Sequence, residues 1–247
     1  MINPMELTGK HIIITGGSSG IGRACAIQAS KLGAKVTVIA RNEEKLKETL
    51  AMTDNPENNA YYCADLSEID KIEDLVKKII AEQGSVDGFC HAAGVGTARV
   101  LKISKINYVD KMFKIHAFAF FEFCRVLSLK KNLNHGASIV GVSSVAAVAG
   151  NIGQDIYAAA KGAMNSFLKP AAKELAMRKI RVNNVAYAMV DTDMYQEFLE
   201  SGGDENAMRL QYLGVIDVET AANAVVFLLS DASKFTTGTV LPVYAGC

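Results

Sequence analysis

The feature that most constrains the fold is an alternation of short β-branched runs with longer stretches of helical pattern. Such alternation predicts βαβ units, in which parallel strands form a sheet and the connecting helices cover both of its faces. We therefore expect an α/β protein with a doubly wound, seven-stranded parallel sheet. Strands are expected at 11–15, 35–40, 60–64, 88–92, 138–142, 181–186 and 239–243, and helices at 21–32, 42–52, 68–83, 109–130, 155–178 and 218–230.

The chain of 247 residues shows no internal repeat and no linker, so we expect one domain over 1–247. The one long stretch without a helical or strand pattern of apolar residues lies between about 187 and 216, where Gly202 and Gly203 stand among polar residues. Segments of this kind are commonly lids, and apolar residues such as Met194 and Phe198 suit a substrate pocket, lid packing or a subunit contact equally. Pro170 lies inside the helix expected over 155–178 and should kink or divide it.

The charge and the cysteine content of the chain limit the kinds of molecule that it is expected to bind. Lys plus Arg and Asp plus Glu each total 26, so the chain lacks the basic excess that binding to duplex phosphates needs. Five widely spaced cysteines without a C-x-x-C pair argue against a disulfide framework or a metal site and suit a reducing cytoplasm. We expect no signal peptide, since the first residues lack a basic start followed by an apolar stretch, and no spanning helix, since no apolar run is long enough. We expect a small-molecule partner, with no nucleic acid, membrane or metal.

A glycine-rich turn follows the first expected strand and leads directly into a helical pattern. Glycines permit a tight turn and close backbone approach, and the free N–H groups of the helix then face an anionic pyrophosphate. A plain strand-to-helix connection is the alternative, although the place after the first strand favours phosphate binding. The expected cofactor contacts in this turn are Gly16, Ser18, Ser19, Gly20, Ile21 and Gly22.

The residues closing the second expected strand indicate which dinucleotide binds. An acid at this position accepts a hydrogen bond from the 2′-hydroxyl of NAD, whereas a guanidinium suits the 2′-phosphate of NADP. Here the chain has Arg41 followed by Asn42, and no acid stands at the strand end. The prediction is NADP(H), the alternative being a solvated surface arginine.

Three polar residues indicate acid–base chemistry. Tyr157 and Lys161 are four residues apart in a helical stretch, so they share one helix face, and an ammonium beside a phenol favours the phenolate. Ser144 follows the fifth expected strand, at the sheet edge where open α/β folds bind ligands. A Tyr-x-x-x-Lys pair alone is often only a solvated helix face, so the interpretation depends on all three residues occurring together.

Taken in order, these motifs closely resemble the short-chain dehydrogenase/reductase family, of the 3-oxoacyl-(acyl carrier protein) reductase type, from about Lys10 to Gly246. The resemblance implies a single-domain Rossmann fold in which Tyr157 is the acid/base, Ser144 steadies the substrate oxygen, and Lys161 binds the nicotinamide ribose and lowers the tyrosine pKa. It also implies a homotetramer or homodimer. Further cofactor contacts by resemblance are Asp65 and Leu66 for adenine, Ala92, Ala93 and Gly94 after the fourth strand, and Val190 and Thr192 for the carboxamide.

Three positions depart from the family pattern. His91 stands in a segment that usually reads Asn-Asn-Ala-Gly, and a structural role in hydrogen bonding to the backbone suits it better than a ligand role. His116 occupies the fourth catalytic position, where the family has Asn; it could keep the proton relay, impair it, or simply pack. Tyr187-Ala188 replaces a Pro-Gly pair beside the nicotinamide.

The leading prediction is an NADP(H)-dependent reductase that converts a ketone or aldehyde to an alcohol, with a 3-oxoacyl thioester as the first candidate substrate. One alternative is a nucleotide-binding sensor or assembly protein with impaired catalysis, which would fit His116 and Tyr187. Another is an oxidising dehydrogenase for a sugar, polyol or steroid alcohol. The presence of Ser144, Tyr157 and Lys161 together favours the reductase.

Overall fold

Seven parallel strands form one sheet in the computed structural model, which describes residues 3–96, 98–200 and 211–247. The strand order is β3-β2-β1-β4-β5-β6-β7, the doubly wound order with its switch point between β1 and β4. This confirms the predicted fold class and all seven predicted strands. The strands are β1 His11–Thr15, β2 Lys35–Ala40, β3 Ala60–Cys63, β4 Val86–His91, β5 Leu133–Ser144, β6 Arg181–Tyr187 and β7 Val240–Val243.

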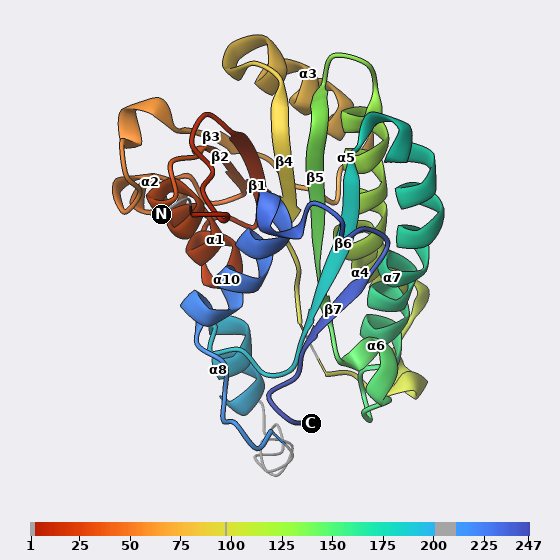
Figure 1. Cartoon of the computed structure of the whole chain (residues 1–247). Helices are drawn as coiled ribbons and strands as arrows, with labels where there is room; N and C mark the ends of the chain where they lie inside the picture. Colours follow the sequence, from red (N-terminus) through yellow and green to blue (C-terminus); the bar gives the residue numbers. More distant parts are fainter. Residues whose placement is uncertain (1–2, 97, 201–210) are drawn as a thin grey trace.

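Helices cover both faces of the sheet, and each face has its own apolar core (Figure 1). One core contains residues of α1 Gly20–Lys31, α2 Glu43–Ala51 and α10 Val218–Leu229. The other contains residues of α3 Ile72–Gln83, α5 Ala119–Ser128 and α7 Asp155–Leu175. Every residue of β1 is buried, because a central strand of a doubly wound sheet has helices on both sides. The carboxyl ends of the strands are thereby held rigidly at one edge.

The helix expected over 109–130 is longer and is divided into three segments. It starts as α4 Ile106–Phe113, widens into a π-helical segment at Lys114–Phe118, and continues as α5. Insertions of this type often occur at functional sites. The π-helical segment contains His116.

Two further expectations differ from the structure. Pro170 does not divide its helix, since α7 runs unbroken past it. The described part of the segment at 187–216 contains regular structure, namely α8 Asp193–Glu200 and a parallel bridge between Val190 and Ile216. Gly202 and Gly203 fall outside the described residues. The remaining short elements are η1 Pro56–Asn58, η2 Ile69–Lys71, η3 Leu101–Ile103, α6 Ala146–Ala149, η5 Ala176–Arg178 and η6 Asp231–Ser233.

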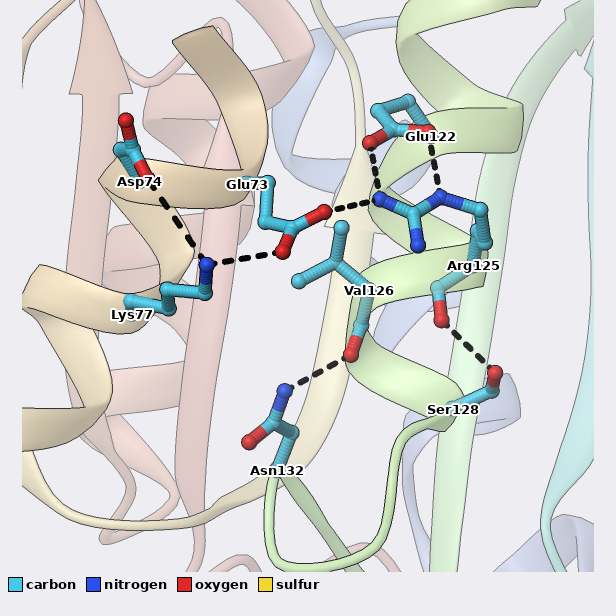
Figure 2. Close-up of polar contacts among 8 residues, drawn as sticks. All are labelled: Glu73, Asp74, Lys77, Glu122, Arg125, Val126, Ser128 and Asn132. Atoms are coloured by element: carbon cyan, nitrogen blue, oxygen red, sulfur yellow. Dashed lines mark hydrogen bonds and ion pairs between the residues drawn. The ribbon is translucent and has the colours of Figure 1, made fainter. Parts of the chain in front are cut away.

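Charged side chains join α3 to α5 across the surface (Figure 2). The guanidinium of Arg125 donates to Glu122 of its own helix and to Glu73 of α3, and Lys77 lies 2.8 Å from Glu73. Each of these pairs is solvent-exposed, so each contributes little to stability. Below them, the Asn132 amide donates to the Val126 carbonyl at 2.7 Å and satisfies an open group at the end of α5.

Two other kinds of site are absent from the described residues. They contain no cluster of three or more metal-binding His, Cys, Asp or Glu side chains. None of their helices is both long and apolar enough to span a bilayer. All five cysteines are free thiols.

Candidate active site

The glycine turn between β1 and α1 has the close packing that a phosphate cradle requires. A Cβ on Gly16 would lie 2.7 Å from the Ala93 nitrogen, and one on Gly22 would lie 2.3 Å from the Gly16 carbonyl oxygen. Gly16 and Gly20 also have positive φ angles, 71° and 51°. Side chains at these positions would push the turn apart.

The N-terminus of α1 has open hydrogen-bond donors. Ser19, the N-cap residue, makes no side-chain capping bond, and the first turn contains no acidic residue. The free N–H groups and the helix dipole therefore favour an anion there, which fits the pyrophosphate of a dinucleotide. The other predicted contacts in the turn, Ser18 and Ile21, are partly accessible beside it.

The adenosine end is formed by the residues after β2 and β3. Arg41 is exposed just past β2, and the neighbouring Asn42 caps α2 by accepting a hydrogen bond from the Lys45 nitrogen at 3.0 Å. The Asp65 carboxylate accepts hydrogen bonds from Ser67 N (2.9 Å) and Oγ (2.8 Å), and these bonds lower the pKa of Asp65. Asp65 and the buried Leu66 line a cavity of about 320 Å³ after β3.

Ser144, at the end of β5, and Tyr157 and Lys161, on α7, form the polar group at the centre of the site. Lys161 is buried, its Nζ donates to the Val142 carbonyl at 2.7 Å, and it lies 5.7 Å from the centroid of the Tyr157 ring. Burial lowers the pKa of Lys161 to about 7. The Ser144 hydroxyl accepts from the Ala146 nitrogen at 3.1 Å. The three predicted residues are therefore together.

The protonation of Tyr157 differs from the sequence-based expectation. Burial raises the pKa of the phenol, and a hydrogen bond with the Ser144 side chain opposes that rise without cancelling it. Desolvation penalises the phenolate. The structure therefore favours a neutral phenol, which is the proton-donating form.

The first residues of α8 close over the same edge. The Thr192 methyl would lie 3.1 Å from a Cβ on Gly20, and the Met194 sulfur 2.5 Å from a Cβ on Gly96. Asp193 lies 3.9 Å from the Lys45 ammonium of α2. The predicted contact Thr192 thus stands beside the phosphate turn, and its hydroxyl donates to the carbonyl of Val190, the other predicted contact, at 3.3 Å. The contact between Met194 and Gly96 was not predicted, although a glycine after β4 was a visible signal.

The comparisons with known proteins agree with this geometry. A family model described as enoyl-(acyl carrier protein) reductase matches residues 16–247, and the chain is 30% identical over 243 residues to the 3-oxoacyl-[acyl-carrier-protein] reductase FabG of Thermotoga maritima. That alignment covers 98% of this chain and 99% of the relative. The chain belongs to the short-chain dehydrogenase/reductase family.

Further relatives in the family carry different names. The L-xylulose reductase of Caenorhabditis elegans is 29% identical over 98% of this chain and 96% of its own. A solved structure of a mutant short-chain dehydrogenase/reductase from Serratia marcescens superposes with a TM-score of 0.88 at 25% identity and covers 99% of both chains. The family consists of oxidoreductases that use nicotinamide cofactors.

His91, the first departure from the family pattern, has a structural role. Its Nδ1 lies 3.0 Å from the Thr15 hydroxyl oxygen, and its Nε2 lies 3.1 Å from the Ile115 carbonyl oxygen. The Thr15 hydroxyl oxygen accepts a hydrogen bond from the Ala93 nitrogen. Burial lowers its pKa to about 3, so the ring is neutral. The predicted hydrogen bonding to the backbone is confirmed. This network fixes the backbone of Ala92, Ala93 and Gly94 at the end of β4.

His116, the second departure, is fixed to the backbone after β4. Its Nε2 lies 2.9 Å from the Val95 carbonyl oxygen, and its ring lies edge-on to Tyr157 with centroids 5.3 Å apart. The His116 ring packs against the backbone at Gly94, since a Cβ added to Gly94 would lie 2.6 Å from Cε1 of His116. Burial lowers the pKa of His116 well below 6.5, and within the described chain its buried Nδ1 has no hydrogen-bond partner. Of the three alternatives, this geometry favours a packed, neutral ring.

Tyr187, the third departure, points away from Ser144, Tyr157 and Lys161, toward α10. Its hydroxyl donates to the Ala221 carbonyl of α10 at 2.6 Å, and its ring is buried in the core on that face. Its carbonyl accepts from the Val145 nitrogen at 2.8 Å, directly after Ser144. The replacement therefore changes the packing behind the site and retains the backbone support next to Ser144.

Proposed function

We propose that this protein is an NADP(H)-dependent reductase that converts a ketone or aldehyde to an alcohol. The observation that carries the proposal is the convergence of Ser144, Tyr157 and Lys161 beside an open helix N-terminus and a glycine turn. A 3-oxoacyl thioester is the leading candidate substrate, which the names of several relatives support. The same site would also run in the oxidising direction on an alcohol.

The bound nicotinamide would supply the hydride. The neutral phenol of Tyr157 donates the proton to the substrate oxygen, and the Ser144 hydroxyl donates a hydrogen bond as charge develops on that oxygen. Lys161 would hold the nicotinamide ribose from the buried side of α7. His116 acts as a positioning residue, since its contact with Val95 fixes the loop beside Tyr157.

We place the remaining cofactor contacts along the same edge, within one domain over 1–247. The pyrophosphate would lie on the turn from Gly16 to Gly22, adenine beside Asp65 and Leu66, and the carboxamide near Val190 and Thr192. The segment at 187–216 would act as the substrate lid, which the proximity of Thr192 to Gly20 and of Met194 in α8 to Gly96 supports. We further propose a cytoplasmic homotetramer or homodimer.

The catalytic assignment is tested with Tyr157→Phe. NADPH oxidation is measured against acyl thioesters, quinones, diketones and sugars, and NADPH binding is measured by fluorescence. We expect turnover to be abolished while the dissociation constant stays within about twofold, because the hydroxyl acts on the substrate. Retained turnover contradicts the role of Tyr157. No turnover of wild type on the whole panel, with tight NADPH binding, favours a sensor.

Cofactor choice is tested with Arg41→Ala. Loss of a charge-assisted hydrogen bond to the 2′-phosphate should weaken NADPH binding by about 10- to 100-fold and leave NADH binding nearly unchanged. Lys130→Ala, an exposed change ahead of the start of β5, is the matched control. Equal or tighter binding of NADH by wild type would show that the preference for NADP is wrong.

A further inference from the structure

Two segments beside the candidate active site expose large aliphatic side chains. The first, 98–106, follows β4, and the second, 148–153, follows β5 and begins within the last residues of α6. Leu101 and Ile106 in the first are 68% and 76% exposed, and Val148 and Ile152 in the second are 72% and 93% exposed. Aliphatic exposure concentrated in this way marks an interaction surface. We call these two segments the mouth surface.

The two segments form one continuous surface. The Arg99 nitrogen donates to the Gly153 carbonyl at 2.8 Å, and the Ala98 Cβ lies 3.7 Å from the position of a Cβ on Gly153. Figure 1 shows the yellow stretch after β4 beside α6, beyond the carboxyl end of the sheet. Ser144 and Tyr157 flank the second segment in the sequence, so the mouth surface borders the catalytic group.

The mouth surface is basic. Arg99, Lys102 and Lys105 are exposed on it, and the stretches 92–109 and 144–154 contain no Asp or Glu. Within the described chain these three cations belong to no salt bridge, and the Arg99 guanidinium lies 4.4 Å from the centroid of the Tyr108 ring. The nearest acid along the first segment, Asp110, is paired with Lys114 at 2.8 Å. Three positive charges thus face solvent among aliphatic side chains.

The exposed aliphatic side chains and the positive charges together indicate what binds to the mouth surface. A second copy docked face to face would bring like charges together, which disfavours self-association. Protein interfaces centre on Trp, Tyr and Arg anchors, whereas the two segments of the mouth surface contain only one such residue, Arg99, whose guanidinium already lies over the Tyr108 ring. Aliphatic residues interleaved with Lys and Arg on exposed turns are what an anionic bilayer surface accepts.

We propose that the mouth surface docks on an anionic lipid bilayer. Leu101, Ile106, Val148 and Ile152 enter the boundary between head groups and acyl chains, and the three cations contact lipid phosphates. A surface contact of this kind needs no spanning helix, and it revises the sequence-based expectation of no membrane partner. If the proposed function holds, the active site faces the bilayer and takes apolar carbonyl compounds dissolved in it.

Vesicle co-sedimentation of the purified full chain tests the proposal. Vesicles of phosphatidylcholine alone are compared with vesicles that also contain phosphatidylserine. We expect at least about tenfold stronger partitioning onto the anionic vesicles, weakening as salt is raised. Two double variants, Ile106→Ser with Ile152→Ser and Lys102→Glu with Lys105→Glu, should each lower the partition coefficient about tenfold or more.

The controls lie at the opposite end of the molecule. Met177 and Phe235 are 91% and 92% exposed, so Met177→Ser with Phe235→Ser removes equally exposed apolar groups and should leave vesicle binding unchanged. Tyr157→Phe should also bind vesicles normally, which separates this proposal from the catalytic one. Equal binding to neutral vesicles, no binding, or insensitivity to both double variants overturns it. The proposal is also overturned if the serine variants change the oligomeric state while the wild-type protein does not bind vesicles.

Discussion

Burial determines the charge of the basic residues around Tyr157. His91, His116 and Lys161 lie below the carboxyl edge of the sheet, and desolvation lowers the pKa of each of them. None of the three has a carboxylate partner among the causes of its shift. His91 and His116 are therefore neutral near pH 7, and Lys161, whose pKa is about 7, is the one of the three that carries positive charge in that range.

The neutrality of His116 leads to a prediction about pH dependence. In the variant His116→Asn, the inflections of kcat/KM between pH 6 and pH 8 should stay where they are in wild type, because the buried ring does not titrate in that range. The absolute rate should change, since the contact with Val95 is altered. Loss or displacement of an inflection in the variant would show that the imidazole is part of the proton relay.

Sequence patterns indicated which polar residues come together in the structure, but not how those residues interact. Ser144, Tyr157 and Lys161 were found because their spacing places them at a strand end and on one helix face. The direction of the Tyr157 pKa was missed, because desolvation depends on residues packed around the ring from distant parts of the chain. The docking of His116 on Val95 depends on tertiary geometry in the same way.

At the level of elements, strands were easier to predict than irregular helices. Buried parallel strands are continuous β-branched runs, so β1 and β2 are visible directly in the sequence. The π-helical segment at Lys114–Phe118 and the one-turn helix α6 have no periodicity of their own. α8 lies in a segment where polar residues and glycines obscured a short amphipathic pattern.

Pro170 gives an element-scale prediction. The residue is exposed within α7, where it removes one backbone hydrogen bond of a helix that nevertheless continues. Pro170→Ala should raise the free energy of unfolding by about 1–3 kcal/mol, because the regained bond outweighs the greater freedom of the unfolded chain. Chemical denaturation measures the change, with the neighbouring exposed Lys169→Ala as the control. A lower stability of Pro170→Ala would mean that the proline fits a bend that the helix requires.

At the scale of the whole molecule, the buried bases of the candidate site, His91, His116 and Lys161, lie on one side of the sheet, whereas the buried Arg181 donates to Leu228 of α10 on the other side. His91 of β4 faces the core that α5 and α7 cover, and its bonds to Thr15 and Ile115 join β1, β4 and the π-helical segment. Lys161 of α7 acts on His91 and His116 through its charge and lowers the pKa of both. Protonation of either imidazole would place an unpaired cation at the junction of these elements. The histidines therefore link global stability to pH.

This link predicts how acid destabilises the protein. The pKa of His91 falls from 6.5 to about 3 on folding, so between these pH values the unfolded chain binds a proton that the folded chain does not. The neutral His91 ring contributes fully to the free energy of unfolding above pH 6.5. As the pH falls from 6.5 toward 3, this contribution is lost, by up to about 1.4 kcal/mol per pH unit for one group. In His91→Asn, the slope of the free energy of unfolding against pH should decrease by the equivalent of about one bound proton. Urea denaturation at a series of pH values measures this slope. The exposed His135, changed in His135→Asn, serves as the control substitution. An equal slope in wild type and His91→Asn would show that the imidazole is not held neutral in the fold.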